Sequence, residues 1–157
     1  MKHYDVPDYS VHNSVGYLMR RGASLLREQL EASFADAGIT FVQWATLILL
    51  RDNPSLTPAE LCRDLRHDSG AFSRMVDQLE QRELLQRLRS DADRRSVQLL
   101  LTVAGRQMIE THLPLVVARL NHALSDFTPA EVATLTSLLT RMIARLEHLP
   151  SLEGESS

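Results

Sequence analysis

The sequence predicts a mainly α protein with one small β-hairpin, and three observations lead to that prediction. Apolar residues recur at helical spacing along most of the 157-residue chain. Two stretches, 84–89 and 96–101, instead alternate partly between apolar and polar residues, as strands do. Capping-box patterns, in which a threonine is followed three residues later by glutamate or glutamine, indicate the starts of three helices at Thr40, Thr57 and Thr128.

The N-terminal part of the chain is expected to form an arm and two helices. Residues 1–10 show no helical period, so they are either an extended arm that packs on a partner subunit or a frayed terminus. Apolar residues recur at helical spacing from Val11 to Ala37, where a following glycine supplies a C-cap. The helix that starts after Thr40 is expected to end near Asn53, because a proline comes next.

The stretch from Leu56 to Thr102 organises the chain. It begins with a short helical pattern, continues with residues 66–70, which are rich in cap and turn formers, and then gives a second helical pattern. Two short helices with so short a connector indicate a helix-turn-helix. The two strand-like stretches that follow flank the charged residues 90–95, which indicates a β-hairpin with a basic tip. A helix-turn-helix followed by such a hairpin is a winged helix, with the hairpin as the wing.

Two further helices are expected after the wing. The first runs from Thr102 to about Leu124, and Pro114 inside it should bend it. The second carries an apolar stripe from Val132 to Leu149. Together they hold more apolar residues than a small winged helix needs to cover itself. We expect a dimer interface built with the first helix, and packing within one chain is the alternative.

The predicted organisation therefore has four parts. Residues 1–37 form the N-terminal arm and helix, which take part in dimerisation. Residues 38–101 form the winged helix-turn-helix, and residues 102–150 form the C-terminal dimerisation helices. Residues 151–157 are expected to be a disordered tail.

Composition limits the function classes. The net charge is −3, so basic residues must be placed locally if the chain binds nucleic acid. All but one of the 17 basic residues are arginine, which suits phosphate and guanine contacts, although GC-rich coding gives the same bias. The single cysteine excludes an intrachain disulfide. No signal-peptide pattern and no apolar run of about 18 residues occurs, so a cytoplasmic protein without a membrane partner is expected.

The wing segment carries a recognisable motif: Asp93-x-Arg95-xxx-Leu99-x-Leu101-Thr102, followed by Gly105. It resembles the wing signature of MarR-type transcriptional regulators, and residues 74–80 resemble the recognition helix of that family. The resemblance covers roughly residues 11–148. It implies a homodimeric winged-helix regulator that binds double-stranded DNA. The family usually has glycine where Glu83 stands, and a glycine there would adopt positive φ easily, so Glu83 argues against that form of helix cap.

The resemblance also implies how the chain would meet DNA. The second helix of the motif would enter the major groove, where its polar side chains reach phosphates and base edges. The arginines of the wing would lie against the minor groove or the backbone. The candidate DNA contacts are Ser69, Ser73, Arg74, Gln78, Arg94 and Arg95.

The first helix offers a candidate effector site. Asn13, Gly16, Tyr17 and Arg20 are spaced i, i+3, i+4 and i+7, so they are expected to share one face. An arginine beside an aromatic ring and open space suits a small aromatic carboxylate, and pairing with a nearby acid is the alternative for Arg20. The resemblance implies that an effector binds between this helix and the winged helix. The candidate ligand residues are Asn13, Tyr17, Arg20 and Trp44.

No motif indicates an enzyme. The chain lacks a Gly-rich phosphate loop, and its six histidines are not spaced as metal ligands, so no catalytic residue, metal or cofactor is expected. Cys62 is expected to be a small buried hydrophobe. The sequence therefore predicts a transcriptional regulator, specifically a repressor relieved by a small molecule, on a near-palindromic operator. The alternatives are a winged helix without effector control and a winged helix that binds only proteins.

Overall fold

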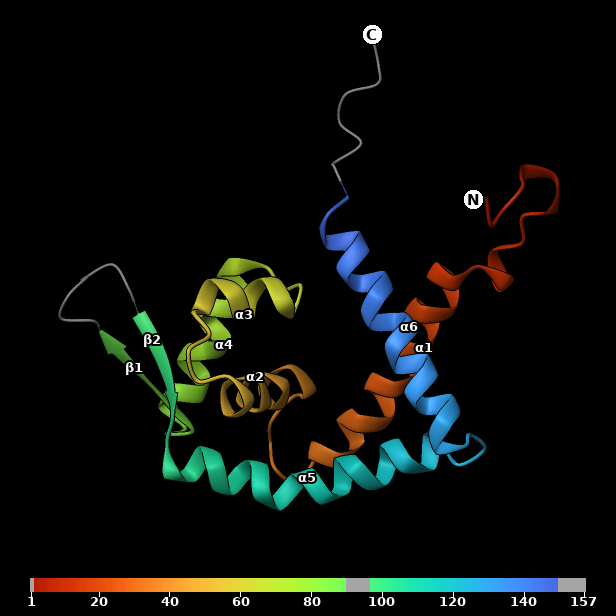
Figure 1. Ribbon diagram of the computed structural model, residues 1–157. Coiled ribbons are helices and arrows are strands. Elements are labelled where there is room, and N and C mark those ends of the chain that lie inside the picture. Colours follow the sequence, from red (N-terminus) through yellow and green to blue (C-terminus); the bar gives the residue numbers. More distant parts are fainter. Residues whose placement is uncertain (1, 90–96, 150–157) are drawn as a thin grey trace, which may run out of the picture. The chain divides into compact units, whose positions relative to one another are not determined.

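The computed structural model describes residues 2–89 and 97–149 (Figure 1). The chain divides into two compact units between Arg119 and Leu120. The predicted fold class is confirmed, because helices dominate and the described strands form one antiparallel hairpin. The α-helices and strands are α1 (Val15–Glu31), α2 (Phe41–Asp52), α3 (Pro58–Asp64), α4 (Ser69–Gln81), β1 (Leu85–Arg89), β2 (Val97–Leu101), α5 (Val103–Ala123) and α6 (Pro129–Glu147). Short 3₁₀ turns, η1 to η3, lie at Val6–Asp8, Val11–Asn13 and Ala32–Phe34.

All three predicted capping boxes are present. In each, the threonine hydroxyl accepts a hydrogen bond from the backbone N–H three residues later, and the side chain of that later residue accepts one from the threonine N–H. Hydrogen bonds from the backbone and hydroxyl of Thr57 lower the pKa of Glu60, and those of Thr128 lower the pKa of Glu131. Each box satisfies two otherwise unpaired groups at the start of its helix, which fixes where α2, α3 and α6 begin.

The first helix is shorter than the sequence pattern predicts. It begins at Val15, where Ser14 is the N-cap, and the residues before it form the 3₁₀ turn η2. The arm is anchored by Tyr4, whose hydroxyl accepts a hydrogen bond from the Val15 amide at 3.0 Å. The predicted end at Ala37 is wrong, because α1 ends at Glu31 and a 3₁₀ turn and a hydrogen-bonded turn follow it.

Both helices of the helix-turn-helix end in the same way. At the end of α4, the Leu84 amide donates to the Leu79 carbonyl at 3.0 Å and the Glu83 amide donates to the Glu80 carbonyl at 2.9 Å. This is a Schellman motif, and it requires a left-handed residue at Glu83, whose φ is +58°. The expectation that Glu83 would not adopt this cap is therefore wrong. Arg66 ends α3 with φ +50°.

The hairpin and the start of α5 pack closely. Strands β1 and β2 pair from Leu85 opposite Leu101 to Arg89 opposite Val97, within one residue of the predicted bounds. The hydroxyl of Thr102 accepts a hydrogen bond from the Gly105 amide at 3.0 Å, so Thr102 caps α5 as expected. A side chain at Gly105 could not fit, because its Cβ would lie 2.0 Å from the Leu84 carbonyl oxygen.

The core of the first unit lies between α2, α4, the hairpin and the first part of α5. Trp44 is 6% exposed, and its ring packs against that of Phe34 with 5.3 Å between centroids. Pro114 lies inside α5, as the sequence predicts. The largest fully buried side chains are Phe34, Leu47, Leu50, Leu61, Leu79, Leu85, Leu99 and Ile109.

The second unit contains the end of α5 and all of α6. None of the residues in α6 is buried, although its sequence carries the predicted apolar stripe. Leu138, Ile143 and Leu146 are each about half exposed, at 48%, 47% and 53%. This face is therefore available to another surface. None of the helices in the described part of the chain is long and apolar enough to cross a membrane.

Candidate nucleic-acid interface

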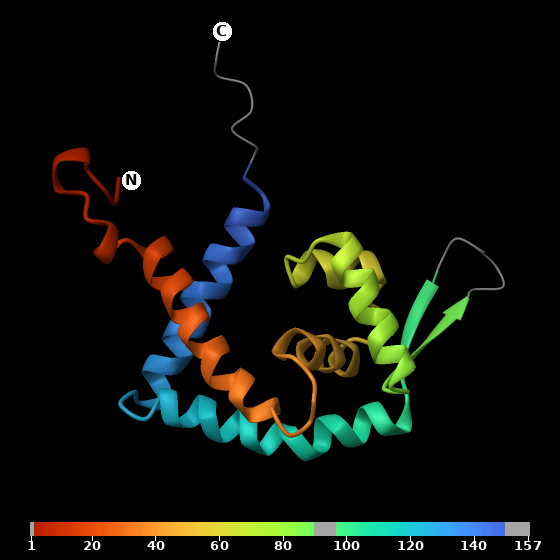
Figure 2. The same cartoon turned by 180° about the vertical axis from the view of Figure 1, so that it is seen from behind.

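The exposed face of α4 is the centre of the candidate interface. One side of this helix is buried in the core through Phe72, Met75, Val76 and Leu79. The opposite side is exposed, and Figure 2 shows α4 lying beside the hairpin. The exposed residues of α4 include all four that the sequence predicts as DNA contacts on this helix: Ser69, Ser73, Arg74 and Gln78. Arg94 and Arg95 lie outside the described residues.

The N-terminal end of α4 gathers the polar groups of this face. Asp68 caps the helix, because its Oδ1 accepts a hydrogen bond from the Ala71 amide at 2.9 Å. Ser69 and Gly70, which the sequence places in the connector, are its first helical residues. A Cβ on Gly70 would lie 3.8 Å from Nη1 of Arg74, so that guanidinium group reaches back over the first turn. Positive charge and free backbone N–H groups at a helix start favour a phosphate.

Gln78 is bound to another helix. Its Oε1 accepts a hydrogen bond from Nε2 of Gln43 at 3.1 Å. Gln43 is 7% exposed and also completes the capping box of α2, where its Oε1 accepts from the Thr40 amide at 2.9 Å. One buried amide therefore links the start of α2 to the predicted recognition helix, and the Oε1 of Gln78 is already used within the protein.

Arg87 on strand β1 joins the wing to α4. Its Nη2 lies 2.7 Å from Oδ1 of Asp77, its Nη1 donates to Oε2 of Glu80, and its backbone N–H donates to Oε1 of Glu80 at 2.9 Å. The hydrogen bond from the Arg87 backbone is the main reason that the pKa of Glu80 is lowered. Burial alone would lower the pKa of Arg87, but the hydrogen bonds to Asp77 and Glu80 raise it. Glu80 and Arg87 therefore both stay charged at neutral pH.

A cavity of about 490 Å³ lies between α3, α4 and the wing. Its walls are largely apolar, and the side chain of Arg87 forms one part of them. Cys62 also lines it, is half-buried rather than fully buried, and donates a hydrogen bond to the His67 carbonyl with 3.1 Å between sulfur and oxygen. The lining residues are Pro58, Ala59, Cys62, Ser69, Phe72, Ser73, Val76, Arg87 and Val97.

The candidate effector residues are brought together only in part. The Arg20 guanidinium lies 5.7 Å from the centre of the Tyr17 ring, as a cation–π pair. Among the described residues Arg20 makes no ion pair, so nothing there supports the alternative role in which it pairs with an acid. Asn13 lies in η2, before α1 begins, so it does not share the helical face that its spacing predicts. Trp44 is in the core, and its indole N–H is buried without a hydrogen-bond partner in the described structure.

Comparisons with known proteins agree with a winged-helix interface. A model of the MarR family matches residues 37–96. Over 106 residues the chain is 36% identical to the multiple antibiotic resistance protein MarR of Escherichia coli. This alignment covers 67% of the chain and 74% of that protein.

The chain belongs to the MarR family.

Further members of the MarR family match over more of the chain. The transcriptional repressor NicR of Pseudomonas putida is 27% identical over 139 residues, 88% of each protein. A variant of Escherichia coli MarR in complex with operator DNA has a TM-score of 0.72 at 30% identity, covering 82% of this chain and 92% of that one. BpsR of Bordetella bronchiseptica, whose DNA binding is regulated by 6-hydroxynicotinic acid, has a TM-score of 0.74 at 26% identity, covering 85% and 96%. This MarR-family chain is accordingly a winged-helix transcriptional regulator.

Sequence reasoning missed three residues that connect the helix of the candidate interface to its neighbours: Arg87, Gln43 and Arg82. The guanidinium group of Arg82 donates to the carbonyls of Ala37 and Gly38, 45 and 44 residues away in the chain. Asp77 and Glu80 lie on the helix that precedes the predicted wing, and an arginine in the middle of the first wing strand was the available signal for their pairing. No sequence signal pairs Gln43 with Gln78.

Proposed function

We propose that this MarR-family protein is a repressor that binds a near-palindromic operator as a homodimer and is released by a small aromatic carboxylate. The observation that carries the proposal is the exposed start of α4. There Ser69, Ser73 and Arg74 lie on the side opposite the buried face, and the sequence between the two strands of the neighbouring hairpin includes Arg94 and Arg95. A helix with this face fits the major groove, with the wing arginines on the minor groove or the backbone.

The dimer is supported by the apolar face of α6, which is not buried in the described structure. Two recognition helices in a symmetric dimer would be spaced about 34 Å apart, so that each enters a successive major groove. A two-fold symmetric dimer reads the same sequence on both strands, which is why the operator should be nearly palindromic.

The DNA-binding step is tested with Arg95→Ala. We expect operator affinity to fall by about 1–3 kcal/mol, as for loss of one good contact, with little change in melting temperature. The measurement is a titration of operator DNA at several salt concentrations, because phosphate contacts make affinity fall as salt rises. Wild-type protein that binds no DNA at low salt would leave a winged helix that binds only proteins. Equal affinity of wild type and Arg95→Ala would remove Arg95 from the interface.

The effector step is tested with Arg20→Ala. The pair of Arg20 and Tyr17 presents a cation and an aromatic face together, which is the chemistry that an aromatic carboxylate needs. The acid that regulates BpsR belongs to the same chemical class. A tenfold loss of DNA affinity requires that the ligand prefer the unbound form by about 1.4 kcal/mol, which one arginine–carboxylate pair can supply.

We expect salicylate or 6-hydroxynicotinate to weaken operator binding by the wild type and to leave Arg20→Ala unaffected, while both proteins bind DNA equally without ligand. Tyr17→Phe is the matched control, because it keeps the aromatic face and should keep the response. A wild-type protein that responds to neither compound is a regulator without this kind of effector control. A response that survives in Arg20→Ala places the ligand elsewhere.

A further inference from the structure

The acidic residues Asp77 and Glu80 present a difficulty for a DNA-binding helix. The Asp77 side chain is 51% exposed and stands three residues after Arg74, on the side of α4 that faces solvent. The Glu80 side chain is 38% exposed. Two uncompensated carboxylates here would repel the phosphates that this face is proposed to meet, since like charges at close range are unfavourable.

Arg87 compensates both carboxylates from the neighbouring strand. Its Nη2 pairs with Asp77, and its Nη1 and backbone N–H pair with the two oxygens of Glu80. Its side chain is only 29% exposed, and both terminal nitrogens point to carboxylates. The guanidinium group is thus turned toward the protein, which leaves it poorly placed to reach a phosphate itself.

The partner strand of the hairpin that carries Arg87 is also bonded to the rest of the protein. On β2, Nε2 of Gln98 donates to the Pro54 carbonyl at 3.2 Å. In the pairing of the two strands, Arg87 stands opposite the fully buried Leu99. The position of the arginine is therefore set by the hairpin and not only by the two acids that it binds.

We propose that Arg87 is a positioning residue for DNA binding, which acts by holding and neutralising Asp77 and Glu80 and not by contacting DNA. This inference rests on the proposed function, because it explains how an acidic stretch of α4 can face a polyanion. In this proposal a residue of the wing neutralises two acidic side chains of the recognition helix.

The experiment is a mutant cycle measured with one probe, the duplex of about 30 base pairs that the wild-type protein selects from a random library. The proteins are wild type, Arg87→Ala, the pair Asp77→Asn with Glu80→Gln, and all three changes together. We expect Arg87→Ala to weaken binding at least about tenfold, the paired neutral variant to bind as well as wild type or better, and the triple variant to lie within about threefold of the paired variant.

Other roles of Arg87 give different results. If Arg87 contacts a phosphate, its loss weakens the paired neutral variant as much as wild type, and the slope of log affinity against log salt falls by about 0.9 in both backgrounds. If Arg87 only braces the fold, the paired neutral variant is already as weak as Arg87→Ala, and the triple variant recovers nothing. Either result overturns the proposal.

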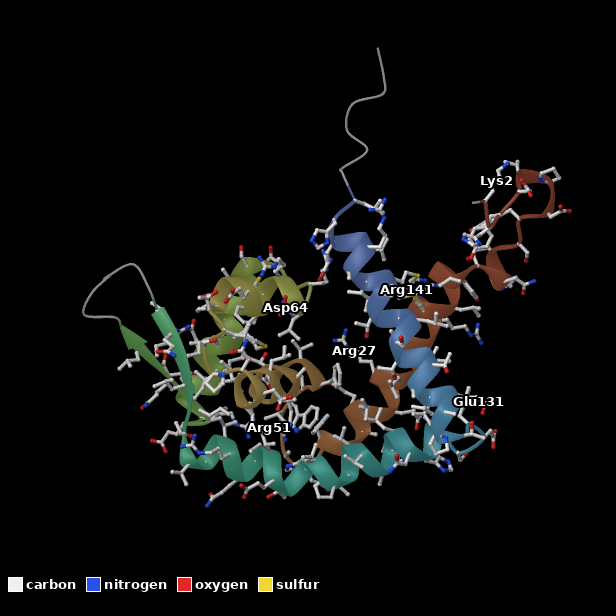
Figure 3. The ribbon with its side chains drawn as sticks, in the orientation of Figure 1. Lys2, Arg27, Arg51, Asp64, Glu131 and Arg141 are labelled. Carbon is white, nitrogen blue, oxygen red and sulfur yellow. The ribbon has the colours of Figure 1, made fainter. Side chains whose placement is uncertain are left out.

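Arg51→Ala is the matched control, because Arg51 of α2 (Figure 3) pairs with the adjacent Asp52 and its loss changes the net charge equally. It should change affinity less than about threefold, as expected for an exposed pair. If Arg87→Ala does not fold, as judged by circular dichroism, the same cycle is run with Arg87→Gln, which also removes the positive charge, under the same criteria. A wild-type protein that selects no duplex refutes the proposed function, whereas a wild type that binds and an Arg87→Ala that binds equally refutes only this inference.

Discussion

Replacing Glu83 with glycine should stabilise this protein, although it removes a charged side chain next to the wing. Glu83 has φ +58° at the end of α4, in a region that disfavours residues with a Cβ. A left-handed conformation costs such a residue about 1–2 kcal/mol, and glycine avoids this cost but loses about 0.5–1 kcal/mol of backbone freedom on folding. The net gain is about 0.5–1 kcal/mol.

The contacts at Glu83 leave this magnitude unchanged. Its amide donates to the Glu80 carbonyl, and its own carbonyl accepts a hydrogen bond from the Thr102 hydroxyl. Both involve backbone atoms that glycine keeps. The side chain is exposed and makes no hydrogen bond or ion pair within the described residues, so its removal loses little.

The assay is reversible denaturant unfolding at matched protein concentration, because the stability of a dimer depends on concentration. Glu83→Gly should raise the free energy of unfolding, and Glu83→Ala should leave it nearly unchanged, since alanine keeps the Cβ. Arg66→Gly at the end of α3, where φ is +50°, should gain stability for the same reason. The reasoning is refuted if Glu83→Gly and Glu83→Ala are equally stable, or if Glu83→Gly is the weaker of the two.

Three other outcomes test the fold. Gly105→Ala should lower the free energy of unfolding by about 3 kcal/mol or more, because its Cβ would overlap the Leu84 carbonyl. Gly22→Ala, which places a Cβ in open space, should raise the free energy of unfolding by up to about 1 kcal/mol. Thermal melts that rank the two variants alike would contradict this. Leu139→Asp should yield a monomer by light scattering, because it places a charge in the proposed interface, and an unchanged dimer mass would locate that interface elsewhere. The pKa of Glu131 is lowered in the folded state, so its cap stabilises the fold fully above pH 4.5, the ordinary pKa of the group. This stabilisation is lost as the pH falls through the folded-state pKa. In acid titrations followed by circular dichroism, Glu131→Gln should therefore lose less stability than wild type as the pH falls below 4.5.

Most of the fold follows from short-range patterns in the sequence. A threonine followed by glutamate or glutamine three residues later fixes the start of α2, α3 and α6, since both partners of each cap lie within one turn. The strand bounds are equally local. The start of α1 was misplaced because η2 continues its apolar pattern, and a 3₁₀ turn cannot be told from a helix start by periodicity alone.

The residues that assemble the interface were less accessible to sequence reasoning. Ser69, Ser73 and Arg74 could be proposed as DNA contacts from the sequence because all three belong to a single helix. The bonds from Arg87 to Asp77, from Gln43 to Gln78 and from Arg82 to Ala37 join residues that are 10, 35 and 45 positions apart. Such pairs depend on how elements pack, which no local period encodes.

The two links from α4 to residues 37–43, which comprise the turn before α2 and the first residues of α2, have a mechanical consequence. Arg82 holds the carbonyls of Ala37 and Gly38 at one end of α4, and Gln78 holds Gln43 one turn earlier. Because there are two attachment points, a shift or rotation of α4 against residues 37–43 must stretch or break at least one of these hydrogen bonds. We therefore expect a displacement of residues 37–43 to move α4 with it, and a variant that loses both links to uncouple the two segments.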